Sequence, residues 1–245
     1  SYPNTNGIVH VYGRVYAGSW TKMAEGVEQA GNGDLLTGVL DGSTNNQSTA
    51  EFGRSVSMTS DGNRIVVGAP GYVYSEPGNL GNQNPDNGCA VVYDFAGTPA
   101  KWNKGNTPFT SASIPHNTSS TSVSGGPSYG SKSGWSVAIS GDGSRMVVGA
   151  PLYTSKYNSG YPDQVIGCAG VYTVATPSTS ASAHTLLGDL IYDFIRQAPN
   201  PNAKRFEMGR DVAISDDGNR VAVSGHYTAG ETLTGNTVTN CGIVR

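Results

Sequence analysis

The stretch that decides the fold is Phe52-Gly53-Arg54-Ser55-Val56-Ser57-Met58-Thr59-Ser60-Asp61-Gly62-Asn63-Arg64-Ile65-Val66-Val67-Gly68-Ala69-Pro70. The same pattern returns at 133–151 and at 208–226. The first glycine and the turn aspartate stand eight positions apart in every copy, at 53 and 61, 134 and 142, and 209 and 217. A constant inner segment with variable spacing outside it indicates one supersecondary unit repeated along the chain, with loops of different length between the copies.

Each copy is predicted to be a β-hairpin. In the first copy, Val56 and Met58 alternate with small polar residues, which is typical of a strand with one buried face. Asp61-Gly62 predicts a tight two-residue turn, because glycine tolerates positive φ and aspartate bonds its own backbone. The following run, 65–67, is almost wholly apolar, so we expect both faces of that strand to be covered. The third copy is the most divergent, since 224–226 reads Ser-Gly-His where the others read Gly-Ala-Pro.

The composition favours short strands and many turns. The chain has 245 residues, of which 36% are hydrophobic and 13% charged, and 34 are glycine. A net charge of −3 without a run of lysine and arginine argues against nucleic acid as the main partner. No stretch reaches the roughly 18 apolar residues of a membrane span. No charged segment followed by an apolar one opens the chain, as a secretory signal would.

A second pattern, Gly-x-x-x-Val-Tyr, occupies 7–12, 88–93 and 167–172, and it begins again at 242. Trp20, Trp102 and His184 follow it at equal steps, so a further strand is expected there, with the tryptophans packed. Residues 186–194 fit either a short helix or a strand, and the repeat register favours the strand. The predicted repeat units are about 7–87, 88–166 and 167–241, with the start of a fourth at 242–245.

Together, Phe-Gly, Gly-Ala-Pro and the Gly-x-x-x-Val-Tyr strand resemble the FG-GAP repeat of integrin α-subunit-like β-propellers. The resemblance covers nearly the whole chain, in three copies. It implies a seven-bladed propeller, and hence an all-β fold in which 1–245 is a single propeller segment built of blades of four antiparallel strands. Because a propeller ring takes about 4–8 blades, we expect these repeats to belong to a longer chain or to assemble with copies of themselves.

Many integrin-type repeats hold Ca²⁺ in a loop of the form Asp-x-Asn-x-Asp-Gly-x-x-Asp between the two hairpin strands. Here 60–63, 141–144 and 216–219 carry only one or two carboxylates each. Ca²⁺ takes 6–8 oxygen ligands. We therefore predict that these turns bind no calcium, and no other metal or cofactor site is expected.

Candidate ligand contacts are aromatic residues of the predicted loops, together with one tryptophan that replaces an arginine of the other copies: Trp135, Tyr153, Tyr157 and Tyr161. Asn46 and Asn117 lie in glycosylation motifs, if the chain is secreted by a eukaryote. An arginine follows each turn, at 64, 145 and 220. These arginines either form a ring of cations for an anionic ligand or bond the turn aspartate or a carbonyl of the next blade, and the second reading is favoured.

Cys89 and Cys168 occupy the same repeat position, and Cys241 directly precedes Gly242, where that pattern begins again. Each of the first two either fills a small buried slot or joins a disulfide between units, and the sequence leaves both open. No catalytic motif is found, and the four histidines show no metal-ligand spacing. The sequence thus favours a non-catalytic extracellular or surface module for adhesion, with a protein or carbohydrate ligand. The alternative is a structural subunit of a filament, appendage, sheath or virus particle, which would bind copies of itself or other subunits.

Overall fold

The computed structural model of the protein describes a defined part of the chain: residues 7, 9–14, 18–23, 50–72, 88–96, 101–104, 130–155, 164–174, 184–192, 207–226, 230–231, 237–238 and 242–244. Within these ranges every regular element is a β-strand, and the sheets are antiparallel. None of the described residues forms a helix that could span a membrane. The predicted all-β class is therefore confirmed for the described part of the chain.

The first sheet contains β3 (Ser55–Met58), β4 (Arg64–Ala69), β5 (Cys89–Ala96) and β6 (Lys101–Lys104). Its strands neighbour one another in chain order, and each pair is antiparallel. It is a four-stranded meander whose strands come from both sides of residue 87, where the first predicted repeat unit ends.

The second sheet repeats this order with β7 (Ser136–Ile139), β8 (Arg145–Ala150), β11 (Cys168–Thr173) and β12 (Thr185–Leu186). A small hairpin of β9 (Thr154–Ser155) and β10 (Gln164–Val165) is inserted between β8 and β11. The strand preferred over a helix at 186–194 is found only in part, because β12 ends at Leu186 and Ile191 forms an isolated bridge with Ala169.

The third sheet contains β13 (Asp211–Ile214), β14 (Val221–His226) and β17 (Gly242–Val244), in that order. A hairpin of β15 (Gly230–Glu231) and β16 (Thr237–Val238) lies between the last two strands in sequence. Near the start of the chain, β1 (Tyr12–Arg14) pairs with β2 (Trp20–Lys22). Trp20 lies opposite Arg14 just as Trp102 lies opposite Phe95, so the tryptophans occupy equivalent positions.

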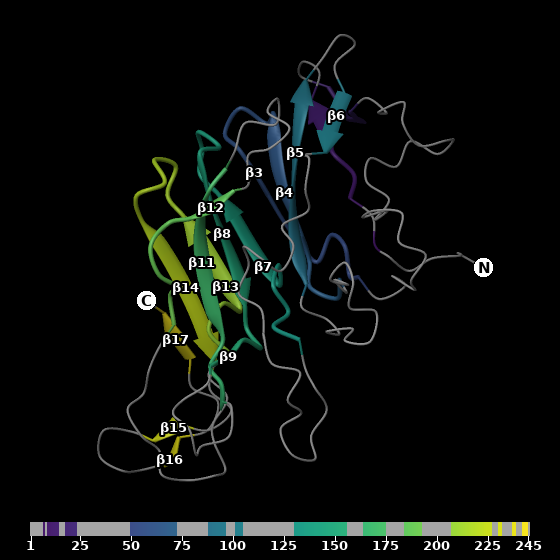
Figure 1. Ribbon diagram of the computed structural model, residues 1–245. Coiled ribbons are helices and arrows are strands. Elements are labelled where there is room, and N and C mark those ends of the chain that lie inside the picture. The colour runs from purple at the N-terminus through teal and green to yellow at the C-terminus, as the bar shows by residue number, and fades with distance from the viewer. Residues whose placement is uncertain are drawn as a thin grey trace, which may run out of the picture.

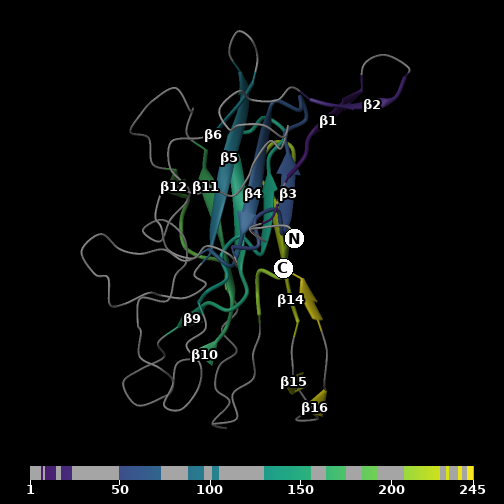
Figure 2. The ribbon, with the colours of Figure 1, turned by 90° about the vertical axis from the view of Figure 1, so that its right-hand side faces the viewer.

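The three sheets are stacked in chain order. Figure 1 shows them following one another from blue through teal to yellow-green, and Figure 2 shows the same stack turned by 90°. Their first strands are adjacent, with β7 between β3 and β13. Parallel bridges from Gly88 to Ser133 and from Gly167 to Met208 join each sheet to the start of the next.

The core is divided into three clusters, and alternate residues of a strand face different clusters. Val67 packs with Val9 and Val11 of the N-terminal segment, whereas Val66 packs with Val137 of the second sheet. The third cluster lies between the second and third sheets. Both faces of β4 and β8 are therefore covered, which explains why these strands are apolar without alternation. The prediction was wrong for the third copy, in which Ala222 is exposed.

The turn between the hairpin strands is longer than predicted. A two-residue turn at Asp61-Gly62 would pair residues 60 and 63, but the last backbone bond runs from the Thr59 N–H to the Arg64 carbonyl. Side chains take the remaining donors, since Thr59 Oγ1 accepts the Arg64 N–H at 3.1 Å and the Asp61 carboxylate accepts the Asn63 N–H at 3.0 Å. The connection is therefore four residues long, 60–63. The other two copies have the same bonds at the equivalent positions.

The tryptophans expected to pack do so only in part. Trp102 is buried, with its ring centroid 5.2 Å from that of Phe95. Trp20 is 67% exposed, so the expectation of packing was wrong for this residue. The two residues differ in their neighbours. Trp102 belongs to the first core cluster, whereas Trp20 does not, although Val11 and Met23 on either side of it in the sequence contact that cluster.

Candidate functional site

The candidate site lies where the first strand of each sheet begins. Glu51, Lys132 and Glu207 have φ of 53°, 56° and 47° and stand two residues before the first glycine of each copy. The chain then folds back on itself, with the Arg54 N–H donating to the Glu51 carbonyl and the Trp135 N–H donating to that of Lys132. This local conformation places residues 54, 135 and 210 at the same end of three neighbouring strands.

These three residues form a stack. The Arg54 guanidinium carbon is 4.1 Å from the centroid of the Trp135 ring, and that of Arg210 is 4.8 Å from it. The two arginines come from the repeats on either side of the tryptophan. A guanidinium over an indole ring is attracted by the electrons of the ring face and keeps its N–H groups free to bond other partners.

Some of the charged residues around the stack form ion pairs, whereas Arg54 does not pair with any described residue. Glu207 is buried and forms an ion pair with Arg210, and Lys132 Nζ lies 3.6 Å from Glu51 Oε1. Arg54 is exposed and forms no ion pair with any residue that the structure describes. The stack therefore presents one available cation, held against an aromatic ring at a fixed place.

The predicted ligand contacts fall in different places. Trp135 is half-buried, and guanidinium groups cover its ring, so it is not a bare platform for stacking a sugar. Tyr153 is half-buried, and its carbonyl accepts the N–H groups of Ile166 and Gly167. The pKa of the Tyr153 hydroxyl is raised, chiefly by burial and to a smaller extent by electrostatic interaction with Cys168 and Tyr192.

Tyr153 stands at the same repeat position as Tyr72, which is buried and whose carbonyl accepts the Gly88 N–H. This equivalence marks Tyr153 as a part of the scaffold, and comparison of the two copies could have found it. The remaining candidates lie outside the described residues: Tyr157, Tyr161, Asn46 and Asn117.

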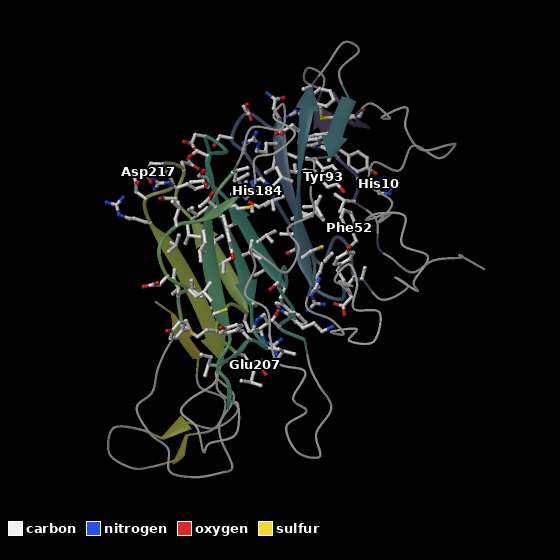
Figure 3. The ribbon with its side chains drawn as sticks, viewed as in Figure 1. His10, Phe52, Tyr93, His184, Glu207 and Asp217 are labelled. Atoms are coloured by element: carbon white, nitrogen blue, oxygen red, sulfur yellow. The ribbon has the colours of Figure 1, made fainter. Side chains whose placement is uncertain are left out.

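The hairpin turns form the opposite end of the stack of sheets. Figure 3 shows Asp217 of one turn at the upper end and Glu207 at the lower end. The pKa of Asp142 is lowered to about 2, first by the Ser140 hydroxyl and then by the backbone and hydroxyl of Ser144. The same kinds of bond lower the pKa of Asp61 and of Asp217. These carboxylates already accept bonds from their own turns, which agrees with the prediction that they hold no calcium, and that prediction stays open.

The arginines that follow the turns join one repeat to the next. Arg64 Nη1 donates to the Gly143 carbonyl at 2.7 Å, and Arg145 Nη1 donates to that of Gly218 at 2.9 Å. The interpretation that an arginine bonds a carbonyl of the next unit is confirmed for these two. Arg220, the third, is exposed.

Three partly buried polar residues, Arg64, Asp94 and His184, lie near one another between the first two sheets. Arg64 Nε is 2.6 Å from Asp94 Oδ1, and His184 is close enough for both to act on it. Burial and then the Arg64 charge lower the pKa of His184 to about 4. His184 takes the place of Trp102 in the second sheet, where it is half-buried.

Cys89 and Cys168 are buried thiols at equivalent positions, opposite Ala69 and Ala150. In the third sheet the equivalent register position, opposite Gly225, belongs to Ile243, and Cys241 lies outside the described residues. Burial raises the pKa of the Cys168 thiol well above its ordinary value, so this thiol is poorly reactive. The filled-slot interpretation is thus favoured for both cysteines.

The arginine and tryptophan stack was missed by reasoning from the sequence. The repeat alignment placed Arg54, Trp135 and Arg210 at one position, but it did not show that the side chains touch. That contact requires the first strands of successive sheets to be adjacent. The chain matches no model of a known protein family and none of the curated proteins, so no relative is available for comparison of this site.

Proposed function

We propose that the chain is a non-catalytic segment of an extracellular β-propeller, which binds a protein or carbohydrate partner as an adhesion module. Support for the propeller comes from the repetition of one sheet order and one set of contacts between sheets, which is how propeller blades are arranged. Support for a binding role comes from the candidate site, which lies at the ends of rigid strands, where binding residues are commonly held.

The observation that carries the binding proposal is the exposed Arg54 guanidinium stacked on Trp135. Its remaining N–H groups suit a carboxylate or sulfate, which a guanidinium binds through paired hydrogen bonds. The partner class that fits is therefore an acidic glycan or an acidic segment of a protein.

An array of neutral and acidic glycans, probed with the isolated protein, tests this function. Acidic glycans should bind, the Arg54→Ala variant should lose most of that binding, and Arg14→Ala should serve as the matched control, because Arg14 is exposed in β1. Equal binding by wild type and Arg54→Ala, or binding of neutral glycans alone, would contradict the assignment to this site. An acidic peptide offered in place of the glycans covers the protein arm of the proposal.

A second candidate function is a structural subunit of a filament, appendage, sheath or virus particle. The observation that favours it is the exposure of Val56 and Met58, at 55% and 44%, where the equivalent Val137 and Ile139 are buried under the preceding sheet. Apolar side chains on an uncovered sheet face are suited to contact with another subunit. Electron micrographs of the native assembly should then show an ordered polymer, and Val56→Asp should disrupt it.

A further inference from the structure

The contact between successive repeats depends on two paired positions at the open end of the hairpin, opposite the turn. Gly68 and Gly149 lie so close to the next repeat that an added Cβ would be 2.0 Å from the Gly134 oxygen and 2.2 Å from the Gly209 oxygen. Any larger side chain at these positions therefore collides with backbone, which cannot move aside as the end of a side chain could. Glycine is required there by the approach of the neighbouring repeat.

The second position supplies a donor to the same carbonyl groups. Ser55 Oγ donates to the Gly134 oxygen at 3.0 Å, and Ser136 Oγ donates to the Gly209 oxygen at 2.8 Å. Glycine and serine thus work as a pair, the one making room for the carbonyl and the other bonding it.

The third repeat departs at both positions. Ser224 stands where Gly68 and Gly149 stand, and Asp211 stands where the two serines stand. An ionised aspartate has no proton to donate to a carbonyl, and here Asp211 Oδ1 accepts the N–H of Val212. Both changes oppose the approach of a carbonyl, one by steric collision and the other by electrostatic repulsion.

The rest of that face is consistent with these two changes. We define the outer face of the third repeat as Asp211, Ala213, Ala222 and Ser224, of which the first three are exposed and Ser224 is half-buried. Ala222 replaces Val66 and Val147, which are fully buried against the next repeat. Less apolar surface is offered there, so docking would gain less from burial.

We infer that Asp211 and Ser224 prevent the outer face of the third repeat from receiving a further repeat through the glycine and serine contact, so that a neighbouring propeller blade would have to be joined there by other contacts. This holds whether the neighbouring repeat would come from the same chain or from another copy. Arg220 stands at the position of Arg64 and Arg145, so the third repeat keeps the side chain that donates to the next turn in the other copies. The substitutions that oppose docking are therefore confined to the end of the strands that carries residues 211 and 224.

A transplant into an internal contact tests the steric part. Gly149→Ser in the full chain should lower the melting temperature by roughly 5–10 °C, because overpacking against backbone destabilises a domain of this size by that amount. Its matched control, Ser224→Gly, should lower it by no more than about 2 °C, the change expected of a surface substitution. Equal melting temperatures for Gly149→Ser and wild type would overturn the inference, since serine would then be accepted in the contact.

The reverse experiment tests whether these residues decide docking. The triple variant Asp211→Ser, Ala222→Val, Ser224→Gly should form dimers or longer chains in sedimentation velocity runs, by placing its altered face on the exposed Val56 and Met58 of another copy. Adding Val56→Asp to the triple variant should abolish this association. A triple variant that sediments as the wild type does would overturn the inference, as would a wild type whose self-association is lost in an Ala222→Arg variant.

Discussion

Ser136 Oγ donates a hydrogen bond of 2.8 Å to the carbonyl oxygen of Gly209, a residue 73 positions later in the chain. The equivalent bond from Ser55 to Gly134 spans 79 positions. The loops between the repeats differ in length, yet the contact is the same. What repeats in this protein is thus both the hairpin and the way in which one hairpin is held by the next.

Removing that hydroxyl should cost stability. Ser136→Ala leaves the buried Gly209 carbonyl without its side-chain donor and should lower the free energy of unfolding by about 1–3 kcal/mol. Asp211→Ala, at the equivalent exposed position of the third repeat, should change it by less than about 0.5 kcal/mol. Urea unfolding followed by circular dichroism measures both, and equal effects would contradict the role of the serine between repeats.

A matched pair of apolar truncations tests the stacking of the first two sheets. Ile139 and Met58 share a repeat position, but Ile139 is 6% exposed beneath the first sheet and Met58 is 44% exposed. Ile139→Ala should lower the free energy of unfolding by about 2–5 kcal/mol, as expected for truncation in a core. Met58→Ala should lower it by less than about 1 kcal/mol. Denaturant titrations in dilute solution compare the two, and a larger loss at Met58 would mean that the sheets are not stacked in this order.

The hairpins could be predicted from the sequence because apolar alternation and the Asp-Gly corner are local signals. The length of the turn could not, since the Thr59 and Asp61 side chains compete with the backbone for the Arg64 and Asn63 N–H groups. Exposure at the two ends of the stack was also missed, as at Trp20. A repeat position gives the direction of a side chain, but burial requires a neighbour to cover it.

From the sequence, the candidate site could be recognised only as a repeat position at which the residue type differs between copies. Trp135 was a candidate ligand contact because arginine stands at 54 and 210, the equivalent positions of the other two copies. The structure brings the side chains of Arg54, Trp135 and Arg210 together. A tryptophan at 135 therefore prevents three guanidinium groups from lying next to one another. Contact between side chains from different repeats is a tertiary property that a sequence alignment of the repeats does not contain.

This account of Trp135 predicts a salt-dependent effect. Trp135→Arg replaces two favourable cation and ring contacts with two repulsions at 4–5 Å, so it should lower the free energy of unfolding by roughly 1–3 kcal/mol at low ionic strength. Raising the salt concentration to about 1 M should recover part of that loss, because salt screens exposed charges. Trp135→Phe should show a smaller loss without salt dependence. Trp20→Arg, at an exposed position, controls for the added charge, and a salt-independent loss in Trp135→Arg would contradict the stack.

His184 predicts a dependence of stability on acid. Its pKa falls from an ordinary 6.5 to about 4 in the folded protein, chiefly through burial and then through the Arg64 charge. The unfolded state therefore binds the proton more tightly, and stability is lost as the pH falls from about 6.5 toward 4, with no further loss from this group below that value. His184→Phe should remove this part of the pH dependence. Unfolding midpoints at several values between pH 7 and pH 4 measure it, and an unchanged slope in the variant would contradict the assignment.

Three equivalent hairpins are joined at their turns into one array. The Ser60 N–H donates to the Gly141 carbonyl at 3.1 Å, and the Gly141 N–H donates to that of Asp216 at 3.0 Å. Asp216 holds the equivalent position in the third turn, and its N–H has no acceptor among the described residues. Amide hydrogen exchange resolved by residue tests the claim most directly. We predict slow exchange at Ser60 and Gly141 and fast exchange at Asp216, whereas fast exchange at all three amides would contradict the stacked array.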